Sequence, residues 1–257
     1  MIVLNEIKQA ETILKTGRVN KKSTVTIMLL AKYFLHYRKF DEVEAYIELD
    51  KFLNKNYPYY NKITWANKVK TMISRAAKYN LRQIEYIPIS EEEIKKIEEV
   101  TSLPKQRVLF TMLCLAKTYN TTSEINNNWV NTSIDDILQS ARVHPRNSDE
   151  KYFMFNELIN DGYLEQASKI SNINFRLTFV GGEDEVMKIS SLDELGYEWN
   201  NYHHYGNYSR CIICGRLYKI NKRCGKYCNM CSQDIKKEQD RKRKSEFGEF
   251  KTSDFTA

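Results

Sequence analysis

Residues 129–162 read WVNTSIDDILQSARVHPRNSDEKYFMFNELINDG, and their caps and apolar positions predict two consecutive helices. Ser133 is a suitable N-cap for the first helix, over 133–142. The turn VHPRN separates it from the second helix, over 148–160. The positions expected to face the core are Ile134, Ile137, Leu138 and Ala141 in the first helix and Tyr152, Phe155, Leu158 and Ile159 in the second.

One more helix is predicted before this helix pair, and a β-hairpin is predicted after it. A further helix, over 104–119, precedes this pair and has Pro104 in its first turn. After the pair, residues 163–180 read YLEQASKISNINFRLTFV, and their alternation of apolar and polar residues predicts a β-hairpin. Three helices and a hairpin form a winged helix-turn-helix, in which the third helix enters a DNA major groove and the wing, here 167–172, lies over the backbone.

The first third of the chain predicts a bundle of helices. Apolar residues recur at helical spacing over 5–15, 23–37, 41–54 and 61–78. The next segment, QIEYIPIS at 83–90, alternates and contains Pro88, as in a short edge strand or an extended linker. Ser90 and Glu93 then form a capping box that opens a helix to about residue 101.

Five of the six cysteines lie in residues 211–231, CIICGRLYKINKRCGKYCNMC. Two CxxC pairs separated by 13 residues are typical of a zinc ribbon or a treble-clef loop, and they supply four thiolates for one tetrahedral ion. Gly215 permits the tight turn after the first pair. The predicted Zn²⁺ ligands are Cys211, Cys214, Cys228 and Cys231. Cys224 is either a spare thiol or a substitute ligand, and Cys114 is predicted to be a core residue.

Positive charge surrounds the cysteines. Residues 210–244 hold 12 Lys and Arg against three Asp and Glu, a formal charge of +9, whereas the whole chain carries +7. So high a density of positive charge favours a segment that contacts nucleic acid over a tail that is only solvated. We expect the nucleic acid to be DNA rather than RNA. The predicted phosphate contacts are Arg216, Lys219, Lys222, Arg223, Lys226, Arg241, Lys242, Arg243 and Lys244, with Arg146 and Lys151 from the winged helix. Asp149 and Glu150 oppose DNA contact by that helix, since carboxylates repel phosphates.

Other classes of protein are disfavoured. The N-terminus, MIVLNEIKQAETILK, lacks the basic and long apolar regions of a signal peptide, and no run approaches the roughly 18 apolar residues of a spanning helix. We therefore expect a cytoplasmic protein with no membrane partner. No phosphate-binding GxxxxGK and no GxSxG is present. His203, His204 and Asn207 before the first CxxC are similar to part of an HNH nuclease, but no histidine follows Cys214, so an enzyme is the less favoured alternative.

A resemblance supports this organisation. The helical N-terminal part, the WVNTSIDDILQSARV segment and the CIIC to YCNMC pairs together resemble a group of uncharacterised proteins from phages and prophages of low-GC Gram-positive bacteria. The resemblance implies a mobile-element origin and, for such a protein, the host cytoplasm as its location. It assigns no catalytic residues.

The predicted fold is mainly α, with an N-terminal helical bundle, a winged helix-turn-helix in the middle and a small C-terminal zinc ribbon with four cysteine ligands. The predicted divisions are 1–82 for the bundle, 83–195 for the winged helix, 196–210 for a linker, 211–232 for the ribbon and 233–257 for a basic helical or disordered tail. The expected function is that of a nucleic-acid-binding regulatory or accessory protein. The alternative is an inhibitor or adaptor that binds a host nuclease, defence system or polymerase.

Overall fold

A computed structural model describes residues 3–20, 22–123, 125–168, 174–220 and 225–253, with the side chains of 241, 242 and 244–253 excepted. The chain is mainly helical, in agreement with the prediction. It divides into two compact units, Met1–Pro88 with Lys188–Ser190, and Ile89–Met187 with Ser191–Ala257. No helix in the described ranges has the length and apolar character needed to cross a bilayer.

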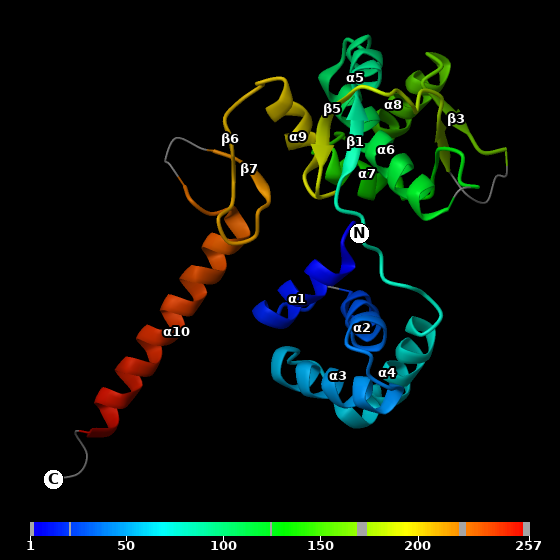
Figure 1. The fold of residues 1–257 in the computed structure, drawn as a ribbon. Helices are drawn as coiled ribbons and strands as arrows, with labels where there is room; N and C mark the ends of the chain where they lie inside the picture. Colours follow the sequence, from blue (N-terminus) through cyan, green and yellow to red (C-terminus); the bar gives the residue numbers. More distant parts are fainter. Residues whose placement is uncertain (1–2, 21, 124, 169–173, 221–224, 254–257) are drawn as a thin grey trace. The chain divides into compact units, whose positions relative to one another are not determined.

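The first unit is a bundle of helices, as predicted (Figure 1). Its elements are α1 (Glu6–Thr16), α2 (Ser23–Lys32), a π-helical turn η1 (Tyr33–Tyr37), α3 (Glu42–Asn56) and α4 (Lys62–Ala76). Asp41 and Glu44 form a capping box at the start of α3, and Gly17 ends α1 in the left-handed conformation that glycine tolerates best. Ile27, Leu49 and Ile73 join α2, α3 and α4 in one buried core.

The second unit is built on a long helix, α6 (Leu103–Thr122), preceded by α5 (Glu91–Glu98). The chain continues through β2 (Trp129–Val130), α7 (Ile134–Ser140), α8 (Ser148–Asn160), β3 (Leu164–Gln166) and β4 (Phe175–Leu177). The three strands form an antiparallel sheet in the order β2, β4, β3. The capping box of Ser90 and Glu93 is confirmed, as is the Ser133 cap, whose hydroxyl accepts from the Asp136 N–H at 3.2 Å. Strands β1 (Ile87–Ser90) and β5 (Glu185–Ile189) pair in a separate two-stranded sheet.

Helix α8 is rotated slightly from the predicted orientation. Tyr152 was expected in the core, but its residue is 45% exposed, and Met154 is buried with Phe155 instead. The Phe155 ring stacks on Phe175 of β4 at 4.9 Å between centroids, and this contact fixes the face that α8 turns to the sheet. Of the predicted wing, residues 169–172 lie outside the described ranges.

Helix α9 (Leu195–Tyr202) lies in the segment 196–210 that the sequence predicted to be a linker. Trp199 is fully buried, with its ring centroid 5.2 Å from that of Phe110 on α6, and its Nε1–H donates to Gln106 at 3.2 Å. A Cβ on Gly196 would come within 2.0 Å of the Ala141 carbonyl oxygen, so glycine permits this close approach. The strands β6 (Tyr208–Arg210) and β7 (Leu217–Lys219) and the helix α10 (Asn229–Ser253) follow.

Candidate metal centre and its basic surroundings

The first cysteine pair lies in the loop of a short hairpin. Strands β6 and β7 are antiparallel, with Arg210 opposite Leu217, so Cys211 to Arg216 form the connecting turn. The Cys211 carbonyl accepts from the Gly215 N–H at 2.8 Å, and the Cys211 N–H donates to Arg216 at 3.0 Å. Gly215 takes a φ of +70°, as predicted from its place after the CxxC. The loop is thereby held in a tight turn with both thiols on one side.

The second pair lies at the start of α10. Cys228 immediately precedes the helix, and Cys231 falls in its first turn. The Ser232 N–H donates to the Cys228 carbonyl at 2.9 Å, which closes that turn. Residues three apart share a helix face, so both thiols point the same way. A zinc ribbon would carry this pair on a second hairpin, whereas the structure carries it on a helix.

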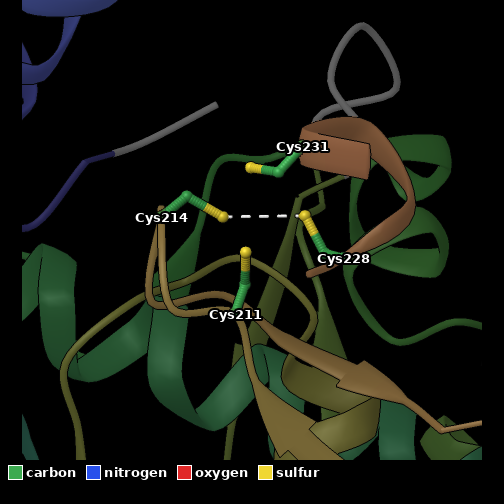
Figure 2. A group of neighbouring side chains, drawn as sticks. All are labelled: Cys211, Cys214, Cys228 and Cys231. Carbon is green, nitrogen blue, oxygen red and sulfur yellow. Dashed lines mark hydrogen bonds between the residues drawn. The ribbon is translucent and has the colours of Figure 1, made fainter. Parts of the chain in front are cut away.

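The four thiols converge. Their sulfur atoms all lie within 4.8 Å of one another, and the Cys214 and Cys228 sulfurs are 3.7 Å apart (Figure 2). Tetrahedral coordination with metal–sulfur bonds of about 2.3 Å would set the sulfurs about 3.8 Å apart. All four are free cysteines, and Cys211, Cys228 and Cys231 are buried. The cluster could therefore hold one metal ion.

Electrostatics at the cluster favour one thiolate. Burial opposes ionisation of Cys211, but backbone hydrogen bonds from residues 213, 214 and 228 outweigh it and lower the pKa of Cys211 to about 6. The Cys214 residue is exposed, yet its sulfur faces the other three, and desolvation there raises its pKa to about 12. Burial also raises the pKa of Cys231. A full set of thiolates at neutral pH therefore requires a bound cation.

The Arg216 side chain, a predicted phosphate contact, instead binds other residues of the protein. Its Nη2 donates to Asp193 at 3.1 Å, and its Nη1 lies 3.1 Å from the Met230 sulfur and 3.9 Å from Glu194. Glu194 also accepts from Arg142 in a two-pronged ion pair. Asp193 and Glu194 belong to the acidic segment 191–196, SLDELG, and no sequence pattern predicts their pairing with the module, because ion pairs between distant segments leave none.

Three of the other predicted C-terminal contacts are exposed. Lys219 and Lys226 are exposed beside the cluster. Arg243 is exposed on α10 and pairs with Asp240 at 3.2 Å. Arg241, Lys242 and Lys244 lie on the same helix, and their side chains are outside the description. Residues Lys222, Arg223 and Cys224 lie outside the described ranges.

The two predicted contacts near α8 differ in their exposure. Arg146 is exposed in the turn before α8. Lys151 is only 19% exposed at its side chain, donates to Asp135 at 3.0 Å and lies over the Tyr152 ring. The hydrogen bond to Asp135 raises the pKa of Lys151. Asp149 and Glu150 are exposed at the start of α8, so the surface of this helix is acidic where a DNA-reading helix would be basic.

His203 is enclosed by aromatic rings. Its ring lies 4.2 Å from that of Trp199 and stacks on Tyr205 at 5.3 Å, and burial lowers its pKa. Within the described ranges, the four cysteines are the group that could hold a metal ion, and no histidine joins them. The described part of the chain therefore contains no histidine-bearing metal site of the kind that the nuclease alternative requires.

Comparison with protein-family models, with curated proteins and with solved structures finds no match for this chain.

Proposed function

We propose that the protein is a nucleic-acid-binding regulatory or accessory factor, encoded by a phage, whose C-terminal module is held together by structural zinc. The observation that carries this proposal is the convergence of four thiols at the point where a hairpin meets α10. Four thiolates in a tetrahedral set suit Zn²⁺, whereas Mg²⁺ and Ca²⁺ require oxygen ligands.

The module fits a treble-clef arrangement better than the ribbon expected from spacing alone. One ligand pair comes from the turn of the β6–β7 hairpin, and the other comes from the first turn of α10. Zinc would fix the start of α10 relative to the hairpin, because the ion bonds to both elements. Exposed Lys219 and Lys226 and the basic stretch of α10 would then meet phosphates from a rigid base.

The middle of the chain supports a winged-helix assignment. Its order is helix, strand, two helices and two strands, with the three strands in one antiparallel sheet. We do not assign DNA contact to α8, because Asp149 and Glu150 are exposed there and Lys151 is paired. In this proposal the winged helix is a scaffold for the basic module.

A second candidate is a protein-binding adaptor, and α8 favours it. Tyr152 is 45% exposed and Phe153 is 62% exposed, beside the carboxylates of Asp149 and Glu150. An exposed aromatic pair next to acids suits a basic and apolar protein surface better than it suits a phosphate backbone. The partner would be a host nuclease, defence protein or polymerase that itself binds nucleic acid.

Fluorescence anisotropy with zinc-loaded protein tests the two candidates. Labelled duplex DNA, single-stranded DNA and RNA are titrated at low and near-physiological salt. Direct binding predicts that log K falls against log salt with a slope of about −0.9 for each duplex phosphate neutralised. Lys219→Glu with Lys226→Glu should weaken binding more than Lys8→Glu with Lys15→Glu, which reverses two exposed charges on α1. No binding to any of the three at low salt would refute the first candidate and favour the adaptor.

A further inference from the structure

The N-terminal unit is a second basic part of the protein. Residues 210–244 are therefore one of two basic parts of the chain, because residues 1–88 are basic as well. Residues 1–88 hold 16 Lys and Arg against eight Asp and Glu, a formal charge of +8. The acidic middle of the chain hides this charge in the overall sum.

Much of this charge lies along α4. Residues 61–81 contain five cations and no carboxylate: Lys62, Lys68, Lys70, Arg75 and Lys78. Lys62 is paired with Asp50 at 3.0 Å, and Lys68 lies over the Trp65 ring. Among the residues that the structure describes, no carboxylate forms an ion pair with Lys70, Arg75 or Lys78. These three exposed cations are available to a ligand.

The same three cations line a groove between the first half of α3 and the second half of α4. Its volume is about 690 Å³, within the range of sites that bind small molecules or short polymer segments. The polar lining is Lys70, Thr71, Ser74, Arg75 and Lys78, the apolar lining is Val43, Tyr46 and Ile73, and Glu42 is the acidic residue among them. The groove therefore combines an aromatic ring with a donor-rich wall.

The spacing of the donors suits an extended polyanion. Lys70 and Ser74 lie four residues apart on one side of α4, and Lys78 follows four residues later in the turn after the helix ends at Ala76. The Lys70 ammonium lies 6.0 Å from the centre of the Tyr46 ring. A nucleotide whose base contacts that ring would therefore have a cation within reach of its phosphate. Val43 is 68% exposed and extends the apolar surface beside the ring.

We propose that this α3–α4 groove binds single-stranded nucleic acid, with a base stacked against Tyr46 and phosphates held by Lys70, Arg75 and Lys78. Sequence-tolerant single-strand sites combine a cationic groove with aromatic stacking in this way. An amphipathic peptide helix docks through several apolar side chains, whereas here five of the nine lining residues carry a cation or an aliphatic hydroxyl. The proposal goes beyond the C-terminal function and holds whether or not that module binds.

The test uses the full-length zinc-loaded protein and a fluorescein-labelled 12-nucleotide oligothymidine that carries 5-iododeoxyuridine. Lys70→Ala, Arg75→Ala and Lys78→Ala together should reduce the slope of log K against log salt by about 2, since single strands contribute about 0.7 per phosphate contact. Photo-crosslinking should place the iododeoxyuridine on the peptide that contains Tyr46. The matched control, Lys8→Ala, Lys15→Ala and Lys55→Ala, removes equal charge from exposed positions that do not line the groove.

Each outcome has a defined meaning. An equal loss in the control would show a general effect of net charge and would overturn the groove proposal. Crosslinks confined to C-terminal peptides would also overturn it, while supporting the C-terminal function. Crosslinks confined to the Tyr46 peptide would support the groove proposal and count against the C-terminal function. Displacement of the oligonucleotide by polyglutamate at equal charge concentration would identify the groove as a site for acidic protein and would refute the assignment to nucleic acid.

Discussion

Arg216 donates a hydrogen bond to Asp193 across 3.1 Å, and this pair joins the cysteine-bearing hairpin to the segment that precedes α9. Both side chains are about three-quarters buried, at 27% and 24% exposure. Asp193 is adjacent to Glu194, which holds Arg142 from the end of α7. The candidate metal module is thus fastened to the helical body by side chains far apart in sequence.

Arg216→Ala should lower the free energy of unfolding by about 1–2 kcal/mol, because Asp193 would keep its charge at a partly buried site without its donor. Urea denaturation followed by circular dichroism measures the change. Zinc content should stay the same, since Arg216 supplies no ligand. Lys219→Ala, at an exposed position on the same hairpin, serves as the control and should be neutral. Loss of zinc in Arg216→Ala would contradict a purely fastening role.

Cys228→Ser should abolish stoichiometric zinc binding and unfold the C-terminal module alone, because binding and folding are linked in so small a unit. Metal analysis by mass spectrometry and limited proteolysis report the two effects. The control is Cys114→Ala, which removes one buried thiol from α6 and should keep zinc. Unchanged metal content in Cys228→Ser would mean that a thiol outside the set of four, such as that of Cys224, replaces Cys228.

Trp199→Ala should destabilise the second unit by about 3–5 kcal/mol, the usual cost of removing a fully buried aromatic side chain. Trp199 contacts Phe110 and donates to Gln106, so both packing and a hydrogen bond are lost. Chemical denaturation provides the measurement. Phe153→Ala, at a position 62% exposed, should change stability by less than about 1 kcal/mol. Similar small losses in both variants would show that α9 is not part of the core.

Glu198 should make stability depend on pH. Burial raises the pKa of this carboxyl above its ordinary 4.5, despite the Arg210 guanidinium 3.0 Å away. The folded state therefore favours the protonated form, and its contribution to stability is lost as pH rises from about 4.5 through the folded pKa. Glu198→Gln should remove this loss and leave the protein at least as stable at pH 7.

Thermal unfolding measured from pH 4 to pH 8 tests the Glu198 prediction. Glu238→Gln changes an exposed carboxyl on α10 and should leave the pH dependence of the parent protein intact. A variant Glu198→Gln that is less stable than the parent at pH 7 would instead mean that the charged pair with Arg210 is net stabilising.

Local chemistry was the part of the structure that could be predicted from sequence. The capping box at Ser90 and Glu93, the cap at Ser133 and the turn at Gly215 each depend on residues within four positions of one another. The same holds for each CxxC pair. Tyr152 was misplaced because helical spacing fixes which residues share a face, while packing of Phe155 on Phe175 decides which face is buried.

The four clustered thiols, the mainly helical content and the caps at Ser90 and Ser133 could be read from the sequence, because backbone geometry and ligand spacing act over a few residues. Three other features emerge from the folded chain alone: Trp199 belongs to the core, Arg216 and Lys151 are held by carboxylates, and α3 and α4 line a basic groove. These features depend on contacts between residues distant in the chain. Such contacts form only when burial of apolar surface brings whole helices together, and no local pattern reports them.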